Sequence, residues 1–134
     1  MEARAVTKQP IKTDRAPAPF QGAPYSQAIR ANGLVFVSGQ VALPPGGGEL
    51  VPGGITEQTE QVFANLAAIL DAAGSSLDRI VKTTVFLQDF ADFAGMNEVY
   101  ARYVGDTPPA RSTFQVSKLP SGALIEIEAV ALVE

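Results

Sequence analysis

The 134-residue sequence contains no cysteine, no histidine and no tryptophan. Without cysteine there can be no disulfide, thiolate nucleophile or zinc–sulfur site. Without histidine the chain lacks the base of Ser-His-Asp triads, a common metal ligand and the side chain that titrates nearest to neutral pH. Any chemistry must therefore use carboxylates, Arg or Lys side chains, hydroxyl groups, backbone groups and water.

Positive charge and long apolar runs are also scarce. The net charge is −4 and the sequence pI is about 4.8, which disfavours non-specific binding to nucleic acid. No segment approaches the roughly 20 apolar residues of a membrane-spanning helix, so we expect no membrane partner. The first 20 residues lack the continuous apolar core of a secretory signal. We therefore expect a cytoplasmic protein, or an organelle-matrix protein if the basic leader is a transit sequence.

The sequence does contain enough apolar material for one hydrophobic core. Hydrophobic residues make up 46 % of the chain and charged residues 18 %, and a chain of this length buries about two-thirds of its unfolded surface. The polar, Pro-rich residues 1–16 predict a flexible N-terminal extension, and residues 17–134 predict a single domain. The low charge content also hints that another subunit covers part of the surface.

Two helices are predicted from apolar residues at three- and four-residue spacing. The first begins at Thr56, a residue type that caps helices, and acidic residues follow in its first turn; it ends at Gly74. The second begins after Asp92 as its cap and ends at Gly105. Its aromatic and Met residues indicate core packing rather than ligand binding.

Strands are predicted over residues 33–43, 79–89, 111–118 and 123–133. In the second of these, Val81, Thr83, Val85 and Leu87 alternate and therefore predict one face. The last two strands, separated by "LPSG", predict a hairpin or connected strand pair. A small extra hairpin near the start is an open alternative.

This order of elements predicts an α+β fold in which two helices cover one face of a mixed sheet. The other face then meets either water or a partner. We favour a partner, because the strands are apolar and carry few charges.

Glu126 and Glu128 interrupt the apolar stretch "ALIEIEAVALVE" and lie on one face of the predicted strand, roughly 7 Å apart. Taken alone, such residues indicate a solvated edge strand. Their spacing also suits a glycosidase carboxylate pair, but the chain has few aromatic residues for binding sugars. Residue patterns alone leave the two glutamates equivalent.

Four further residues are candidates for binding a small anion. Arg111 follows "PPA" at the start of a strand, and its guanidinium suits bidentate binding of a carboxylate. Ser38 and Gly39 end a strand, where a hydroxyl and an unshielded N–H can meet an anion, or where they simply terminate the strand. Tyr25 is either a packing aromatic or a polar tip at a pocket mouth.

The segments "APYSQA", "VFVSGQ", "IVKTTVFLQDFADF", "MNEVY" and above all "PPARSTFQVSKLPSGALIEIEA" resemble the Rid (reactive intermediate deaminase) family, most closely its RidA type. The resemblance runs in unbroken order from about residue 17 to residue 134. It implies a chorismate-mutase-like fold and a homotrimer, in which the sheets form a central barrel and the pockets lie between subunits.

The resemblance also implies an activity: hydrolysis of 2-imino acids such as 2-iminobutanoate and 2-iminopropanoate, released by pyridoxal-phosphate-dependent dehydratases, to 2-oxo acids and ammonia. It requires no cofactor and no metal. Arg111 would bind the substrate carboxylate and Glu126 would position the attacking water. The other implied site residues are Tyr25, Ser38, Gly39, Phe93, Asn97 and Thr113, the last standing where many bacterial members have cysteine.

Three other functions compete with this interpretation. The same pocket in a non-catalytic protein would bind a 2-oxo acid and report it to a partner, which needs Arg111 but not Glu126. Endoribonuclease activity, or inhibition of translation, is disfavoured by the acidic pI and by the absence of histidine. A chaperone-like role through the apolar surface would be indifferent to substitution of Arg111.

Overall fold

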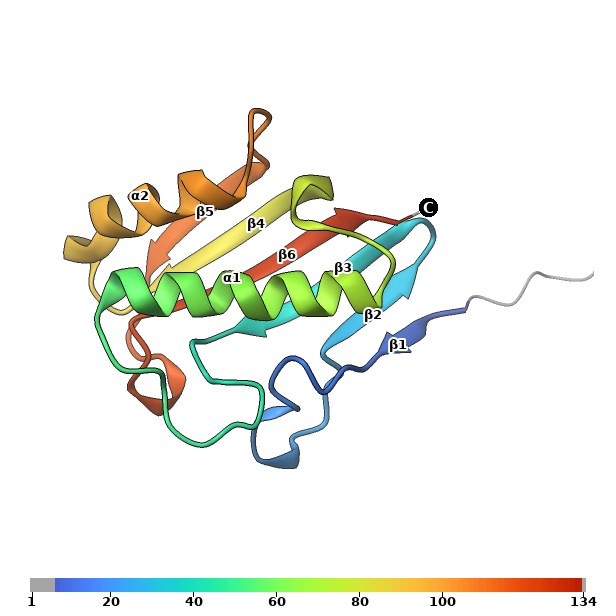
Figure 1. Cartoon of the computed structure of the whole chain (residues 1–134), viewed down its shortest axis with the longest axis horizontal. Coiled ribbons are helices and arrows are strands. Elements are labelled where there is room, and N and C mark those ends of the chain that lie inside the picture. The colour runs from blue at the N-terminus through green and yellow to red at the C-terminus, as the bar shows by residue number, and fades with distance from the viewer. Residues whose placement is uncertain (1–6, 134) are drawn as a thin grey trace, which may run out of the picture.

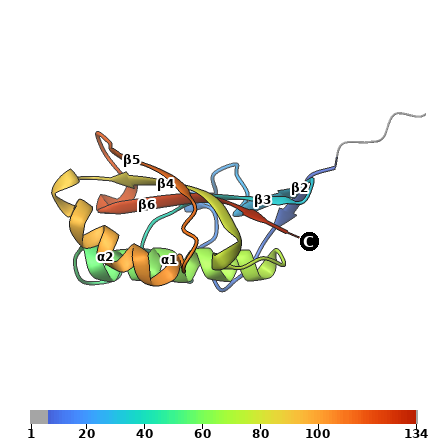
Figure 2. The same ribbon diagram turned by 90° about the horizontal axis from the view of Figure 1, so that it is seen from above.

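One mixed β-sheet carries two helices on a single face in the computed structural model, which describes residues 7–133 (Figures 1 and 2). The strands are β1 (Gln9–Ile11), β2 (Ala28–Ala31), β3 (Leu34–Gln40), β4 (Ile80–Leu87), β5 (Ala110–Gln115) and β6 (Ile125–Leu132). The helices are α1 (Ile55–Ala72) and α2 (Phe93–Tyr103). The strand order is β1-β2-β3-β6-β4-β5, in which only β4 and β5 are parallel neighbours. The predicted α+β class is confirmed.

The predicted pairing of the last two strands is wrong. β5 pairs with β4 alone, whereas β6 inserts between β3 and β4. Burial explains the choice, because alternate residues of β6 from Ile125 to Ala131 are buried under the helices, while β5 has no buried residue and suits an edge. Glu126 and Glu128 therefore lie on a central strand and not on a solvated edge.

An additional hairpin joins β2 to β3, as the alternative near the start of the chain allowed. Its two-residue loop is Asn32–Gly33, with φ of 54° and 79°. Positive φ at both positions is the geometry of a type I′ turn, which matches the twist of the flanking strands.

Residues 9–16 belong to the domain rather than to an extension. β1 pairs antiparallel with β2, and both Ile11 and Ala16 are buried in the core. The chain therefore joins the sheet before residue 17, because strand pairing and two buried side chains hold this segment against the core. The prediction of flexibility for residues 1–6 lies outside the described residues.

Both helices form close to their predicted positions, but only α2 has the predicted N-cap residue. The N-cap of α1 is Gly54 rather than Thr56, and the Glu57 carboxylate accepts the Gly54 N–H at 2.9 Å. Asp92 precedes α2 as predicted but makes no capping hydrogen bond; Asp89 accepts the Ala91 N–H at 2.8 Å in the turn before it.

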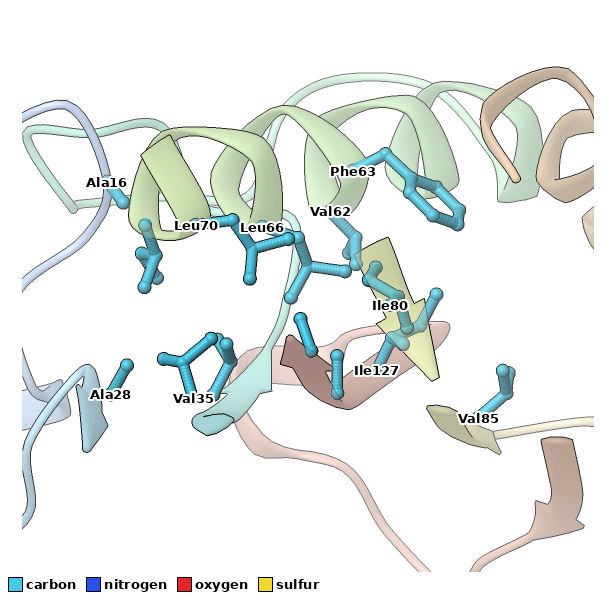
Figure 3. Close-up of a cluster of buried hydrophobic side chains, with 14 of the residues drawn as sticks. Ala16, Ala28, Val35, Val62, Phe63, Leu66, Leu70, Ile80, Val85 and Ile127 are labelled. Carbon is cyan, nitrogen blue, oxygen red and sulfur yellow. The ribbon is translucent and has the colours of Figure 1, made fainter. Parts of the chain in front are cut away.

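The core lies between α1 and the sheet, where α1 side chains such as Val62 and Leu66 point toward Val35 and Ile127 (Figure 3). On β4, Thr83, Val85 and Leu87 share one face as predicted and are buried, but Val81 is 40 % exposed. The register shift between Ile80 and Lys82 turns Ile80 inward in place of Val81.

The sheet face opposite the helices, here called the open face, is covered by neither α1 nor α2 (Figure 2). Phe36, Phe114 and Leu132 project from it with exposed fractions of 45 %, 52 % and 46 %. Large apolar side chains exposed on an uncovered sheet face are a feature of surfaces that bind a partner. Across residues 7–133 the structure holds no helix with the length and apolar character to cross a bilayer.

Candidate functional site

A pocket of about 440 Å³ lies where β3 ends beside the first half of β6. It is lined by Pro17, Ala18, Phe20, Tyr25, Gln27, Ser38, Gly39, Gln40, Val41, Leu43, Pro120, Glu126 and Glu128. Four of the predicted site residues, Tyr25, Ser38, Gly39 and Glu126, are therefore brought together. They come from three separate parts of the chain.

The Glu126 carboxylate lies directly against the backbone of Gly39. A Cβ added at Gly39 would meet the Glu126 carboxyl carbon at 2.8 Å. Gly39 sits where the register of β3 against β6 shifts between Val37 and Gln40, so a local irregularity and a missing side chain together make room for the carboxylate. Only glycine therefore fits at residue 39, because any side chain there would collide with the Glu126 carboxylate.

Burial raises the pKa of the Glu126 carboxyl above its ordinary value of 4.5, and the neighbouring negative charge of Glu128 raises the pKa further. Glu128 lines the same pocket but is exposed. A half-buried carboxylate with a raised pKa has the properties of a general base.

Ser38 and Tyr25 hold the pocket together through their own hydrogen bonds. The Ser38 hydroxyl donates to the Ser26 carbonyl at 2.6 Å, and its N–H donates to the Gln27 carbonyl at 2.9 Å. The Tyr25 hydroxyl accepts the Phe20 N–H at 2.6 Å. The amide of Ser38 is therefore committed to the fold, whereas its hydroxyl oxygen and that of Tyr25 keep lone pairs for a ligand.

The second group of predicted residues lies around Arg111 at the start of β5. The guanidinium carbon of Arg111 lies 4.7 Å from the centroid of the Tyr100 ring and 5.6 Å from that of Phe93. Its Nη1 donates to the Met96 sulfur at 4.0 Å. Tyr100 is fixed in turn by a 2.7 Å hydrogen bond with the buried Thr83 hydroxyl. Among residues 7–133 Arg111 forms no ion pair.

Asn97 and Thr113 lie near this group. Asn97 follows Met96 on α2, and Thr113 is two residues beyond Arg111 on β5, which places both β5 side chains on the same side of the strand. Each is half-buried. Arg111 forms one cluster with Phe93, Met96 and Tyr100, here called the arginine cluster. Asn97 lies one helical turn after Phe93 on α2, and Thr113 lies on the same side of β5 as Arg111.

The arginine cluster and the Glu126 pocket lie on opposite faces of the sheet. Arg111 is in register with Thr83, which is buried toward the helices, whereas Glu126 is in register with Phe86 on the open face. Strand β4 also lies between the two strands that carry them. Arg111 and Glu126 therefore do not share a pocket within one chain.

Several pocket residues were missed from sequence, among them Pro17, Ala18, Phe20, Gln27 and Pro120. They come from segments without regular periodicity, which carry no signal of which way a side chain points. Within the described part of the chain, no three acidic side chains gather closely enough to hold a metal ion.

The geometry defines a single-sheet α+β domain with an acidic pocket on one face and an unpaired arginine on the other. A family model described as "Endoribonuclease L-PSP" matches residues 13–133. The chain belongs to this family, which also includes the proteins called RutC and Rid.

Three similar proteins illustrate the family. A RutC family protein of Pyrococcus horikoshii is 52 % identical over 95 % of this chain and 99 % of its own length. The mouse protein named 2-iminobutanoate/2-iminopropanoate deaminase is 44 % identical over 96 % of this chain and 93 % of its own length. The crystal structure of E. coli TdcF with bound serine is 40 % identical, covers 94 % of this chain and 99 % of its own, and has a TM-score of 0.87.

Proposed function

We propose that this protein is a 2-imino acid deaminase, which hydrolyses reactive imines such as 2-iminobutanoate and 2-iminopropanoate to 2-oxo acids and ammonia. The observation that carries the proposal is the Glu126 carboxylate, held in a pocket against the bare backbone of Gly39 with its pKa raised. The name of the mouse relative supports it at 44 % identity.

In the proposed reaction Glu126 orients a water molecule and accepts its proton as the oxygen attacks the imine carbon. The C–O bond forms and the C=N electrons move to nitrogen, which gives a carbinolamine. Proton transfer to nitrogen then allows the C–N bond to break, and ammonia leaves as the carbonyl forms. General-base assistance of this kind contributes about 10²–10⁴-fold, which suffices for a substrate that is already electrophilic.

Arg111 is the proposed ligand of the substrate carboxylate. Its guanidinium is held by Tyr100 and Phe93 and, within the described residues, is not neutralised by an ion pair. Each charge-assisted hydrogen bond to a carboxylate contributes about 1.5–3 kcal/mol. Asn97, Phe93 and Thr113 would line this side of the site, and a threonine here precludes the thiol-based effects of members with cysteine.

A site with both groups requires more than one chain, because Arg111 and Glu126 lie on opposite faces of one sheet. We propose a homotrimer with its sites between subunits. Its chorismate-mutase-like barrel would bury the open sheet face that carries Phe36, Phe114 and Leu132. Each chain would then give Arg111 to one neighbour and Glu126 to the other, a head-to-tail contact that closes into a ring.

Two other functions compete with the deaminase proposal. The serine bound in the TdcF crystal structure supports a small-carboxylate ligand but fits a non-catalytic 2-oxo acid sensor equally. Endoribonuclease activity, suggested by the family description, is disfavoured by a pI of about 4.8.

We propose a cytoplasmic location, with an organelle matrix as the alternative because an Arabidopsis relative is named chloroplastic.

A coupled assay tests the proposal. A threonine dehydratase generates 2-iminobutanoate, and the disappearance of the imine absorbance is followed with and without this protein. The wild-type protein should accelerate the loss. Arg111→Ala should abolish the gain and Glu126→Ala should lower it about 10²-fold or more, as expected for loss of a general base.

The exposed ion pair between Arg102 and Glu60, at 3.2 Å, supplies matched controls of the same residue types. Arg102→Ala and Glu60→Ala should hydrolyse the imine at the wild-type rate. Wild-type protein without effect on the imine would overturn the deaminase proposal. Activity that needs Arg111 but survives Glu126→Ala would overturn the role of Glu126.

A further inference from the structure

Residues 13–20, here called the strap, leave the sheet after β1 and cross the end of α1 before they reach the pocket. The Arg15 guanidinium donates to the Asp71 carboxylate of α1 at 2.8 Å, and Ala16 is buried in the core. Farther along the strap, Pro17, Ala18 and Phe20 form one wall of the Glu126 pocket. The strap belongs to no regular element up to Phe20, so side-chain contacts must hold it in place.

Gln27 provides most of these contacts. Its side chain is buried at 3 % exposure, and its Oε1 accepts the Thr13 N–H at 2.7 Å. Its Nε2 donates to the carbonyls of Thr13, Ala16 and Pro17 at 3.0, 3.2 and 2.8 Å. One side-chain amide therefore forms hydrogen bonds with four backbone groups of the strap.

Gln27 also connects the strap to the catalytic side of the pocket. Its backbone carbonyl accepts the Ser38 N–H at 2.9 Å, next to the Gly39 backbone that supports Glu126. At the outer rim, the Tyr25 hydroxyl accepts the Phe20 N–H. Gln27 therefore sets the position of the strap relative to Glu126. Tyr25 sets the position of Phe20 at the far end of the strap.

The pocket is divided by chemistry. Glu126, Glu128 and Ser38 supply polar atoms to the lining, and the strap residues Pro17, Ala18 and Phe20 supply apolar atoms, together with Val41, Leu43 and Pro120. A 2-imino acid held with its imine carbon at Glu126 has two remaining substituents, a carboxylate and a side chain. The carboxylate belongs with Arg111, which leaves the side chain to face the apolar strap.

We propose that the strap sets the size of the substrate side chain and that Gln27 is the positioning residue that fixes the strap at its working distance from Glu126. The proposal rests on the 2-imino acid function above, since it assigns the remaining wall of that same site. Gln27 itself need not contact the reacting atoms.

Two variants test the proposal from opposite directions. Gln27→Leu removes all four hydrogen bonds at similar volume and should release the strap. Ala18→Leu adds bulk at an exposed position of the wall and should narrow the pocket. Arg15→Ala is the matched control, because it removes only the solvent-exposed ion pair with Asp71 at the back of the strap.

The measured quantity is the selectivity between a branched and a small ligand, 4-methyl-2-oxopentanoate and 2-oxobutanoate. Dissociation constants come from NMR titration, and hydrolysis rates come from the corresponding imines generated by an amino-acid oxidase. Ala18→Leu should shift selectivity against the branched compound on the order of tenfold, the scale of a methylene-sized misfit. Gln27→Leu should shift it the other way by several-fold and abolish hydrogen-exchange protection of the Thr13 amide. Arg15→Ala should leave the ratio unchanged.

The outcomes separate the two proposals. Equal effects of Ala18→Leu on both ligands, in a wild-type background that hydrolyses imines, would overturn the strap proposal alone. Shifted binding selectivity in a protein that accelerates no imine loss would support the strap and overturn the deaminase proposal. If Gln27→Leu fails to fold, the Ala18→Leu ratio still decides the role of the wall.

Discussion

At the scale of single residues, the pocket depends on the pairing of Glu126 with Gly39. A buried carboxylate is costly, and this one lies near a second negative charge and against a backbone that offers no side chain. Its folded-state pKa is raised, so protonation favours the folded chain. Stability contributed by this group is greatest below the ordinary pKa of 4.5 and falls as the pH rises through the raised value.

Glu128→Gln should shift the pH dependence of hydrolysis. Loss of the Glu128 charge removes one of the two causes that raise the pKa of Glu126. The general base then stays ionised to lower pH, and the acidic limb of the kcat/KM profile should move to lower pH while the plateau is retained. Rates measured across a pH series on both proteins provide the check.

Glu49→Gln is the control for this shift, because Glu49 is exposed on a loop outside the pocket. It should leave the acidic limb in place. An acidic limb that does not move in Glu128→Gln, or one that moves to higher pH, would contradict the assignment of Glu126 as the titrating base.

At the scale of elements, the hairpin of β2 and β3 depends on the backbone of its two-residue turn. Gly33 has φ of 79°, and a Cβ added there meets nothing closer than a carbonyl oxygen at 3.9 Å. Gly33→Ala should therefore cost about 1–2 kcal/mol through conformational strain alone, without a clash. Thermal unfolding should show a lower Tm, by a few degrees for a domain of this size.

Gly46→Ala is the comparison for that measurement, since Gly46 has open space around it and no positive φ. Its Tm should equal that of the wild type or rise slightly. Equal melting temperatures for Gly33→Ala and the wild type would show that a side chain at residue 33 does not strain the backbone of the turn.

The helices and strands also show which features of the fold can be predicted from sequence patterns. Both helices were predictable, because spacing at three and four residues is a local property. The β2–β3 hairpin was predictable too, since Asn-Gly between two apolar runs is a strong turn signal. Strand partners were not, because the place of β6 between β3 and β4 depends on which strand buries the most apolar surface. The inward turn of Ile80 in place of Val81 likewise follows from pairing with β6.

The pocket itself was only partly predictable. Tyr25, Ser38, Gly39 and Glu126 do meet, as the resemblance implied, whereas the patterns alone had favoured a solvated edge for Glu126. Whether Arg111 joins them could not be predicted, because it depends on the sheet face that each strand presents.

At the scale of the whole molecule, the separation of Arg111 from Glu126 permits a test by mixing. Arg111→Ala and Glu126→Ala proteins, each inactive alone, should regain activity when dissociated, mixed in equal amounts and reassembled. In a head-to-tail ring, an intact Arg111 meets an intact Glu126 at about one interface in four. The mixture should therefore show about a quarter of wild-type activity per chain in the imine assay.

The double variant Arg111→Ala/Glu126→Ala, mixed with either single variant, is the negative control and should regain nothing. A mixture of the single variants that stays inactive, while native mass spectrometry shows mixed oligomers, would mean that each site is built within one chain.

The central position of β6 governs when this fold can form. Leu132 on β6 pairs with Leu34 on β3, which lies far earlier in the sequence. Without β6 the sheet divides into the pair β4–β5 and the trio β1–β3. Contacts of such long range are slow to form. During synthesis the sheet therefore stays in two parts, with exposed strand edges, until β6 (Ile125–Leu132) has left the ribosome. β6 therefore joins the two parts of the sheet, and the sheet is complete only when β6 is in place.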